Sequence, residues 1–273
     1  MTLNNTAENR NEKITLKVYR QNRRQDSGSH YDSFEVPFKK WTTVLDALLY
    51  VKSYMDPSIA IRYSCRMASC GSCGMKINGI PRLACYTKIS ELKTPTIECE
   101  PLSNLPIIRD LVTDFSRFFD HHKSMHPYIE SKVGSDNDTG EGTFSFYQSP
   151  EDVDKYLQFS YCIKCGLCYS ACPTVATDLK FPGPQALAQQ YRYFADTRDE
   201  SKKRLDIVND KHGIWRCHFA GSCSKVCPKG VDPALGIQLL KSYMLGISKN
   251  DKVPAKKIKI DGISESNGRS DTK

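Results

Sequence analysis

The sequence predicts an α+β protein in which a small β-grasp domain precedes an all-α domain. In the first third of the chain, apolar residues alternate with polar ones, which is typical of half-buried strands, whereas helical patterns dominate the second half. All but one of the twelve cysteines also fall into three short runs, one in the first half and two in the second. A chain of 273 residues is long enough for two domains that each bury a core.

Charge and composition narrow the class of protein. The net charge is +8, but much of the basic excess lies near the ends of the chain, so we expect no nucleic-acid partner. Residues 1–12 are polar and partly acidic, unlike a secretion signal or a mitochondrial transit peptide. No run approaches the ~20 apolar residues of a membrane span. The cysteines are therefore expected to lie in a reducing compartment, where clustered cysteines more often bind metal than form disulfides.

The first domain is expected over 13–106, after a disordered lead over 1–12. Its strands are predicted from the alternation of apolar and polar residues, its helix from a cap at Thr42 or Thr43, and a hairpin from the Asn78-Gly79 turn signal. The predicted elements are strands over 13–19 and 31–38, a helix from 44 to about 55, strands over 75–77 and 82–84, and a strand over 96–100.

The second domain is expected over 107–247, after a linker over 101–106. Gly, Asp and Ser are frequent over 131–142, which predicts a mobile surface loop. The polar and basic segment 248–273 is predicted to be a disordered tail. Helices are predicted over 107–128, 151–160, 184–195, 198–209 and 232–245.

The first cysteine motif is Cys65-x4-Cys70-x2-Cys73-x11-Cys85, the plant-type ferredoxin spacing that binds a 2Fe–2S cluster through four thiolates. Gly71 lets the backbone curl so that its N–H groups can approach the sulfides. A structural zinc site is the alternative, although zinc ligand pairs are usually further separated. With β-grasp elements on both sides, the motif predicts a plant-type 2Fe–2S ferredoxin-like domain.

The second motif is a bacterial-ferredoxin run of four cysteines that begins at Cys162 and ends at Cys172-Pro173. In such a run the first three thiolates bind one cubane cluster and the fourth usually serves a second cluster, so the all-α domain is expected to be bacterial-ferredoxin-like. We assign the 4Fe–4S cluster to Cys162, Cys165, Cys168 and the distant Cys227.

The third group of ligands is then Cys172, Cys217 and Cys223. An intact second run would carry a cysteine at position 220, where this chain has Ala220. Three thiolates suffice for a 3Fe–4S cluster, which we predict here, with an open-corner 4Fe–4S cluster or a zinc site as alternatives. The remaining cysteine, Cys99, occupies an apolar position in the alternating pattern of a strand and is predicted to be a core residue.

No machinery for hydride transfer or nucleophilic catalysis accompanies these motifs. The sequence contains neither a G-x-G-x-x-G fingerprint nor a G-x-x-x-x-G-K-[ST] phosphate loop. Three clusters of different type predict a relay for single electrons, and any organic chemistry is expected on a partner. We therefore predict no catalytic residue in this chain.

With these motifs in view, the sequence resembles the iron–sulfur subunits of succinate dehydrogenase and quinol:fumarate reductase in their prokaryotic form. The resemblance runs from about residue 14 to residue 245. It is carried by Ser64-Cys65-Arg66 through Cys73, by 78–85, LPIIRDL at 105–111, the Cys162 run, YRYFADTRDE at 191–200, Arg216-Cys217-His218 and Val226-Cys227-Pro228-Lys229-Gly230.

The resemblance implies the electron-transfer subunit of a succinate dehydrogenase of the tricarboxylic acid cycle and respiratory chain. The 2Fe–2S cluster would face the FAD of a separate flavoprotein, and the 3Fe–4S cluster would lie nearest the membrane. Anchor subunits would hold the chain peripherally at the cytoplasmic face of the cell membrane, where quinone takes the electrons. The alternatives are a fumarate reductase that runs the relay in reverse, a free polyferredoxin carrier, and a zinc-binding scaffold.

The resemblance also implies quinone contacts at Pro173 and His218, since the family's quinone pocket draws on the region after the Cys-Pro step and on this histidine. A partly buried side chain beside the cluster is the alternative for His218. Many quinone-reducing members carry a tryptophan a few residues after the Cys-Pro step, whereas this chain reads TVATD over 174–178. This departure bears on the quinone residues and leaves the cluster ligands untouched.

Three histidines, His121, His122 and His126, lie close together in the sequence and could suggest a metal site. They match no motif of the family, so we expect solvated surface histidines instead.

Overall fold

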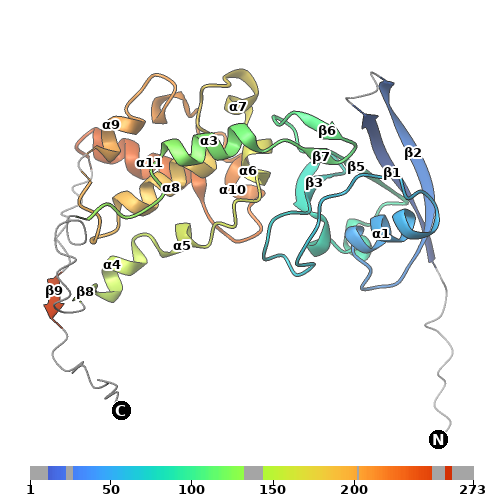
Figure 1. Cartoon of the computed structure of the whole chain (residues 1–273), viewed down its shortest axis with the longest axis horizontal. Helices are drawn as coiled ribbons and strands as arrows, with labels where there is room; N and C mark the ends of the chain where they lie inside the picture. The colour runs from blue at the N-terminus through green and yellow to red at the C-terminus, as the bar shows by residue number, and fades with distance from the viewer. Residues whose placement is uncertain (1–11, 23–26, 132–143, 202, 248–255, 260–273) are drawn as a thin grey trace, which may run out of the picture.

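The computed structural model describes residues 12–22, 27–131, 144–201, 203–247 and 256–259. A strand-rich domain and a helical domain lie side by side along the long axis of the molecule (Figure 1). This arrangement confirms the predicted α+β fold. The predictions for 1–11, for 132–142 and for most of 248–273 lie outside the described residues.

The N-terminal domain is built on a seven-stranded sheet in the order β4-β3-β5-β1-β6-β7, with β2 paired to β1. Strand β1 is antiparallel to β2 and parallel to β5. Ile14, Leu16 and Val18 are buried, which confirms the predicted alternation, although β1 continues past the predicted end. The strands are β1 (Glu12–Asn22), β2 (Ser27–Phe38), β3 (Gly74–Ile77), β4 (Ile80–Leu83), β5 (Thr96–Glu100), β6 (Ile107–Arg109) and β7 (Val112–Thr113).

Helix α1 (Val44–Tyr54) packs against this sheet and begins where the sequence predicts. The hydroxyl of Thr43 accepts a hydrogen bond from the Asp46 N–H, and the Asp46 carboxylate accepts one from the Thr43 N–H, which is a capping box. Its apolar face, which includes Val44, Leu45 and Leu48, lies in the core. A short 3₁₀ helix (η1, Ala84–Tyr86) and α2 (Ile89–Leu92) follow the β3–β4 hairpin.

The predicted hairpin turn is confirmed at Asn78 and Gly79, which have φ values of +49° and +77°. Two consecutive positive φ values are what a type I′ turn requires, and Asn-Gly adopts them readily. The Asn78 side chain also accepts a hydrogen bond from the Glu98 N–H at 2.8 Å, which ties the turn to β5.

The prediction of a helix over 107–128 is wrong in its first part, because β6 and β7 form a hairpin there and helix α3 (Ser116–Ser124) starts later. The buried carboxylate of Asp110, whose φ is +48°, explains the turn. It accepts hydrogen bonds from the N–H groups of Gln21 and Ala60 and pairs with Arg20. These partners fix Asp110 in a left-handed conformation that a helix cannot contain.

The helical domain packs α8 (Pro184–Phe194) against α11 (Pro233–Met244), with α3 and α5 also against α8 (Figure 1). These two longer helices confirm the predictions over 184–195 and 232–245. The remaining elements are α4 (Pro150–Asp154), α5 (Leu157–Ser160), α6 (Leu167–Ser170), α7 (Pro173–Thr177), α9 (Arg204–Val208), the 3₁₀ helix η2 (Ile214–Arg216) and α10 (Ser222–Lys225).

Two predicted helices are shorter than expected. The helix over 151–160 is split into α4 and α5, and the helix over 198–209 is reduced to α9. In the latter, the Arg198 side chain and N–H donate hydrogen bonds to the buried Asp196 carboxylate, which stabilises a turn before α9. The tail prediction is wrong for 256–259, which form strand β9 (Lys256–Lys259) paired with β8 (Phe144–Tyr147).

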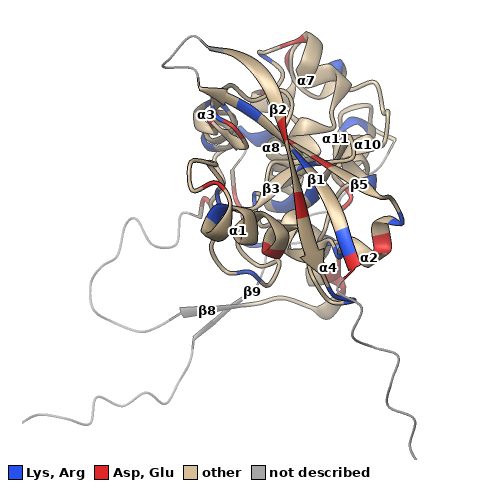
Figure 2. Cartoon of the chain, turned by 90° about the vertical axis from the view of Figure 1, so that its right-hand side faces the viewer, with Lys and Arg blue, Asp and Glu red and all other residues tan. Residues whose placement is uncertain are grey.

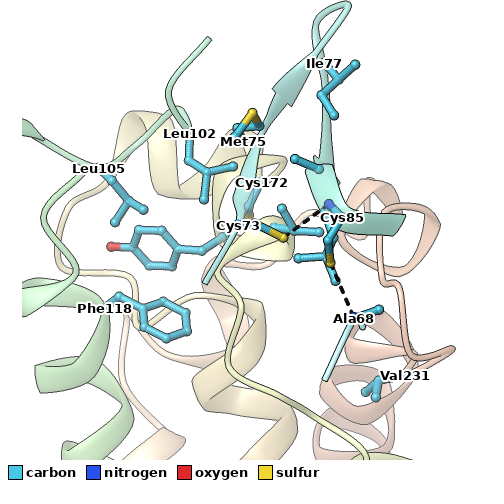
Figure 3. Packing of buried hydrophobic residues seen from close by; sticks show 14 of the residues in the cluster. Ala68, Cys73, Met75, Ile77, Cys85, Leu102, Leu105, Phe118, Cys172 and Val231 are labelled. Atoms are coloured by element: carbon cyan, nitrogen blue, oxygen red, sulfur yellow. Dashed lines mark hydrogen bonds between the residues drawn. The ribbon is translucent and has the colours of Figure 1, made fainter. Parts of the chain in front are cut away.

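The predicted linker over 101–106 is packed between the two domains. Leu102 and Leu105 are buried in one hydrophobic core that includes residues of both domains (Figure 3). The Asn104 amide donates hydrogen bonds to the carbonyl oxygens of Tyr169, Ser170 and Cys172 at 3.0–3.1 Å. The connection therefore fastens the N-terminal domain to the loop that carries Cys172.

Basic and acidic residues are interspersed on the side of the molecule shown in Figure 2. No helix among the described residues has the length and apolar character that crossing a membrane requires.

Candidate iron–sulfur sites

The loop between Cys65 and Cys73 directs its backbone N–H groups at sulfur atoms. The Sγ of Cys65 accepts from the N–H groups of Met67, Ser69 and Cys70 at 3.3–3.4 Å. Thiolates with several N–H donors are typical of iron–sulfur loops, because the donors stabilise negative charge on sulfur.

The other two cysteines of this group are buried on the inner side of the loop. The Cys85 N–H donates to the Sγ of Cys73 at 3.4 Å, and the Ala68 N–H donates to the Sγ of Cys85 at 3.3 Å (Figure 3). Cys85 is supplied by η1, directly after the β3–β4 hairpin. The structure thus brings all four cysteines of the first motif to one loop.

The buried and the exposed thiols of this loop differ in pKa. Burial raises the pKa of Cys73 to about 12. The Ser72 hydroxyl, followed by the N–H groups of Cys65 and Ser72, lowers the pKa of the exposed Cys70 to about 6. Iron binds the thiolate, so binding at the buried side releases a proton that the free thiol would hold.

The backbone of the loop is held in an unusual conformation. Arg66 and Ala68 both have φ values of +58°, and Gly71 has +76°. Such conformations cost free energy for residues with a Cβ and persist where the surroundings impose them, often at functional sites. At Gly71 the surroundings are the second cysteine motif: a Cβ there would lie 2.8 Å from the Cβ of Cys165 and 3.2 Å from the Ile163 carbonyl oxygen.

The second group of cysteines surrounds a cavity between α6, α8 and the segment after α10. Apolar residues such as Leu167 and Val231 line it, together with the side chain of Gln185. Burial raises the pKa of Cys165 to about 12 and that of Cys168 well above its ordinary value. The four thiols on this cavity are those of Cys162, Cys165, Cys168 and Cys227.

The third group, Cys172, Cys217 and Cys223, lines a second cavity, and Ala220 lies on the same wall. Burial raises the pKa of Cys172, and it raises that of Cys223 to about 11. The structure thus brings together the three cysteines that the sequence left for a third cluster.

The second and third groups are built on a repeated backbone motif. Lys164 and Gly166 have φ values of +55° and +77° before α6, and Phe219 and Gly221 have +58° and +70° before α10. Both helices are four residues long and begin after the glycine. In this repeat Ala220 occupies the position of Cys165, so the chain lacks a thiolate where the repeat would supply one.

The donor sets fit iron–sulfur clusters. Within the described residues, no three His, Cys, Asp or Glu side chains converge on a point that would hold a single metal ion, and the second and third groups instead surround cavities. Four thiolates suit a 2Fe–2S or 4Fe–4S cluster, and three suit a cluster that lacks one iron.

Comparison with known proteins gives the family. A model of the 2Fe–2S iron–sulfur cluster binding domain matches residues 15–120, and a model of the 4Fe–4S dicluster domain matches 158–231. The chain is 45% identical over 226 residues to the fumarate reductase iron–sulfur subunit of Escherichia coli O6:H1, which covers 82% of this chain and 90% of that protein. The chain belongs to the family of iron–sulfur subunits of fumarate reductase and succinate dehydrogenase.

Further relatives extend this result across the family. The chain is 36% identical to the mitochondrial succinate dehydrogenase [ubiquinone] iron–sulfur subunit of Dictyostelium discoideum, over 88% of this chain and 85% of that protein. Its structure matches a chain of the Mycobacterium smegmatis Sdh1 complex in the apo form with a TM-score of 0.77 and 25% identity, over 87% of this chain and 97% of that one. As an iron–sulfur subunit of this family, the chain has a 2Fe–2S ferredoxin-like domain and a helical 4Fe–4S domain and transfers electrons.

The residues predicted to contact quinone lie at the third site of this iron–sulfur subunit. Pro173 and His218 both line the cavity with Cys172, and both side chains are exposed. A quinone contact stays a prediction for both residues. Cys99 is fully buried, as predicted for a core residue.

The prediction that the three histidines are solvated is wrong for His122, which is buried against α8. Its Nδ1 lies 3.2 Å from the Nε2 of Gln185. His121 also has a buried Nδ1 with no hydrogen-bond partner. His126 is closer to the expectation, since its side chain is partly exposed and pairs with Glu130 at 2.8 Å. His122 lies on the face of α3 that packs against the core. The expectation rested on the absence of a family motif, which does not indicate which face of a helix a residue occupies.

Two residues near the sites gave no signal in the sequence. Asn104 binds three carbonyl oxygens beside Cys172, and Gln185 lines the second cavity. Gln185 is buried in the first turn of α8, together with Pro184, Ala186 and Leu187.

Proposed function

We propose that this chain relays electrons between the FAD of a partner flavoprotein and quinone, as the iron–sulfur subunit of a succinate dehydrogenase. The observation that carries the proposal is that the three cysteine groups lie in series. The loop of the first group touches the second at Gly71 and Cys165. Helix α6, which contains Cys168 of the second group, packs against α10, which contains Cys223 of the third group.

The proposed ligand sets follow from these groups. The 2Fe–2S cluster would be held by Cys65, Cys70, Cys73 and Cys85, the 4Fe–4S cluster by Cys162, Cys165, Cys168 and Cys227, and a 3Fe–4S cluster by Cys172, Cys217 and Cys223. When bound, these clusters take up and release single electrons. The absent thiolate at Ala220 supports the 3Fe–4S assignment.

The chain's own residues would set the environment of each site. Backbone N–H groups directed at Cys65 and Cys85 stabilise negative charge at the first site. Apolar residues such as Leu167 and Val231 exclude water from the second site. Because hydrogen bonds to sulfur and solvent exposure both shift reduction potentials, these differences would separate the potentials of the three sites.

The two ends of the series would face different partners. The first site has the exposed thiol of Cys70 and would face the flavoprotein, where succinate is oxidised. The third site has Pro173 and His218 at its rim and would face quinone and the membrane anchor. The chain would therefore lie peripherally at the cytoplasmic face of the cell membrane, held by anchor subunits.

The reverse reaction, fumarate reduction, is the second candidate function. It is favoured by the names of several relatives, among them the fumarate reductase iron–sulfur subunits of Haemophilus influenzae, 41% identical over 251 residues, and Mycobacterium tuberculosis, 41% identical over 231 residues. The same ligand groups would serve both directions.

The test is purification of the complex from native membranes. We expect a flavin-bearing subunit to co-purify, and succinate to reduce the clusters and then a quinone within the complex. Quinol-driven fumarate reduction that exceeds succinate oxidation would assign the fumarate reductase direction instead. If no flavin-bearing subunit co-purifies, the chain is a free carrier, and if the protein is colourless and lacks EPR signals after dithionite reduction, it is a zinc-binding scaffold.

A further inference from the structure

The side chain of Asn104 reaches from the connection between the domains to the segment that carries Cys172. Its Nδ2 donates hydrogen bonds to the carbonyl oxygens of Tyr169, Ser170 and Cys172 at 3.0, 3.1 and 3.1 Å. An amide NH₂ group has two hydrogens, so these oxygens share them. The Ser103 N–H adds a further bond, to the Oγ of Ser170 at 2.9 Å. Two consecutive residues of the connection thus bind the same short stretch of the helical domain.

These carbonyl oxygens lie where α6 ends and α7 begins. Tyr169 and Ser170 are the last two residues of α6, and the last carbonyl oxygens of a helix lack N–H partners further along it. Cys172 directly precedes α7, and its carbonyl oxygen also accepts a hydrogen bond from the Ala176 N–H at 3.4 Å. Asn104 therefore binds the end of one helix and the start of the next, and Cys172 lies between the two.

The backbone of the connection is fixed by its own packing. Asn104 has a φ of +65°, in the left-handed region that asparagine adopts more readily than most residues with a side chain. Leu102 and Leu105, on either side of it, are buried in the same apolar cluster as Cys172 (Figure 3). The packing of these neighbours holds the backbone from which the amide reaches the carbonyl oxygen of Cys172.

The same connection also lies against the loops of the first two cysteine groups. A Cβ at Gly74, next to Cys73, would lie 3.4 Å from the Cδ1 of Leu102. A Cβ at Gly166, next to Cys165, would lie 3.7 Å from the same atom. The connection thus contacts the chain beside a cysteine of each of the three groups.

We propose that Asn104 is a positioning residue for the third cluster, which holds Cys172 at a fixed place relative to the second site. The inference rests on the ligand assignment proposed above. Helix α6 carries Cys168 of the second group, and Asn104 binds the chain where this helix ends and leads to Cys172. A ligand whose surroundings are held by hydrogen bonds keeps its cluster in one geometry. When one electron passes from the second cluster to the third, the second is oxidised, the third is reduced, and no bond of the chain forms or breaks.

Asn78 offers a matched control. It is another asparagine of the N-terminal domain with a positive φ, +49°. Its side chain accepts a hydrogen bond from the Glu98 N–H at 2.8 Å and donates one to the Oγ1 of Thr94 at 3.4 Å. None of these partners belongs to a cysteine group. Loss of this amide therefore removes comparable hydrogen bonds from the same domain without affecting the segment that carries Cys172.

The test is EPR spectroscopy of the intact complex at controlled potentials, with wild-type chain, Asn104→Gly and Asn78→Gly. Glycine adopts the left-handed conformation without strain, so each variant loses the amide alone. We expect the oxidised 3Fe–4S signal of Asn104→Gly to broaden, because Cys172 is then less well fixed, and its amount per 2Fe–2S cluster to fall. The 2Fe–2S and 4Fe–4S signals should stay in place, and all three signals should be unchanged in Asn78→Gly.

A second variant and a second measurement keep the test decisive. Asn104→Asp nearly keeps the shape and the backbone conformation but has no donor when ionised, so its 3Fe–4S signal should change at least as much. Hydrogen exchange at the amides of 171–176 should be faster in both variants than in the wild type. An unchanged 3Fe–4S signal in both variants, unchanged exchange, an equal change in Asn78→Gly, or the joint loss of all three signals overturns the inference. A wild-type complex without a 3Fe–4S signal overturns the ligand assignment instead.

Discussion

Arg204 and Asp199 form an ion pair that is buried inside the helical domain, with side chains 1% and 0% exposed. The Nε of Arg204 donates to the Oδ2 of Asp199 at 2.7 Å, and a second guanidinium nitrogen donates to Oδ1 at 2.5 Å. The guanidinium also donates to the carbonyl oxygens of His126 and Tyr128. The pair thereby fastens the segment after α3 to α9.

Replacement of Arg204 by Met should destabilise the helical domain strongly. It removes the buried guanidinium that pairs with the Asp199 carboxylate, and breaking a buried pair in this way costs about 3–5 kcal/mol. The measurement is the thermal unfolding midpoint of the anaerobic protein. Lys155→Met is the control, because it breaks the partly exposed Lys155–Asp152 pair, and such pairs contribute about 0–1 kcal/mol. Equal effects of the two variants would contradict the prediction.

Cys73→Ser should alter the 2Fe–2S signal alone. The Sγ of Cys73 lies within the hydrogen-bonded loop of the first group and contributes to neither cavity of the helical domain. EPR of the reduced and oxidised protein separates the three cluster types. Cys99→Ser is the matched control, since Cys99 is equally buried but outside every group, and all three signals should survive there. Loss of the 4Fe–4S or 3Fe–4S signal in Cys73→Ser would show that the assignment is wrong.

Ala220→Cys should convert the third cluster to a 4Fe–4S cluster. In the repeated backbone before α6 and α10, position 220 lies between Phe219 and Gly221 as Cys165 lies between Lys164 and Gly166. A thiolate at 220 would complete a fourth ligand on the cavity that Cys172, Cys217 and Cys223 line. We expect the EPR signal of the oxidised 3Fe–4S cluster to disappear. Ala220→Ser adds no thiolate and should retain this signal. If Ala220→Cys also retains the signal, position 220 does not correspond to Cys165.

Gly71→Ala should increase the distance between the first and the second cysteine groups. Gly71 and Gly79 have nearly the same φ, +76° and +77°, so the strain of a Cβ is similar at both. Only at Gly71 would the new carbon collide, at 2.8 Å, with the Cβ of Cys165, whereas Gly79 has nothing within 4 Å. We expect Gly71→Ala to weaken the magnetic interaction between the first two clusters. Gly79→Ala should cost about 1 kcal/mol and leave the spectra unchanged.

Much of the fold could be predicted because local signals and tertiary packing agree. The buried Ile14, Leu16 and Val18 follow the period of a strand, and the Thr43–Asp46 capping box begins α1. The turn at Asn78-Gly79 has the two positive φ values that these residues favour. The cysteine spacings likewise predicted which thiols lie together, because in the bacterial-ferredoxin pattern three cysteines of a run serve one site and the last serves the other.

The errors arise where distant residues override a local pattern. Asp110 turns the chain between β6 and β7 because Arg20, Gln21 and Ala60 bind its carboxylate, and none of these lies near it in sequence. The His122–Gln185 contact joins α3 to α8 across 63 positions of sequence. A helical period predicts which face is buried, but it does not predict which polar side chain of another helix meets it.

The burial of His122 also predicts an acid sensitivity of the fold. Its pKa is about 4 in the folded protein and about 6.5 in an unfolded chain, so between these values the unfolded chain binds a proton that the native protein does not. The contribution to stability is therefore complete above pH 6.5 and is lost as the pH falls towards 4. The loss should amount to about 1–3 kcal/mol.

Urea unfolding of the anaerobic protein at several pH values between 5 and 7.5 measures this effect. His122→Leu cannot bind the proton, so the free energy of unfolding should fall less steeply with acid in this variant than in the wild type. His30→Leu is the control, because the His30 side chain is 63% exposed and lies on β2, away from the helical domain. Its profile should run parallel to that of the wild type. Parallel profiles for His122→Leu and the wild type would mean that the imidazole at 122 is protonated in the native state as readily as in the unfolded chain.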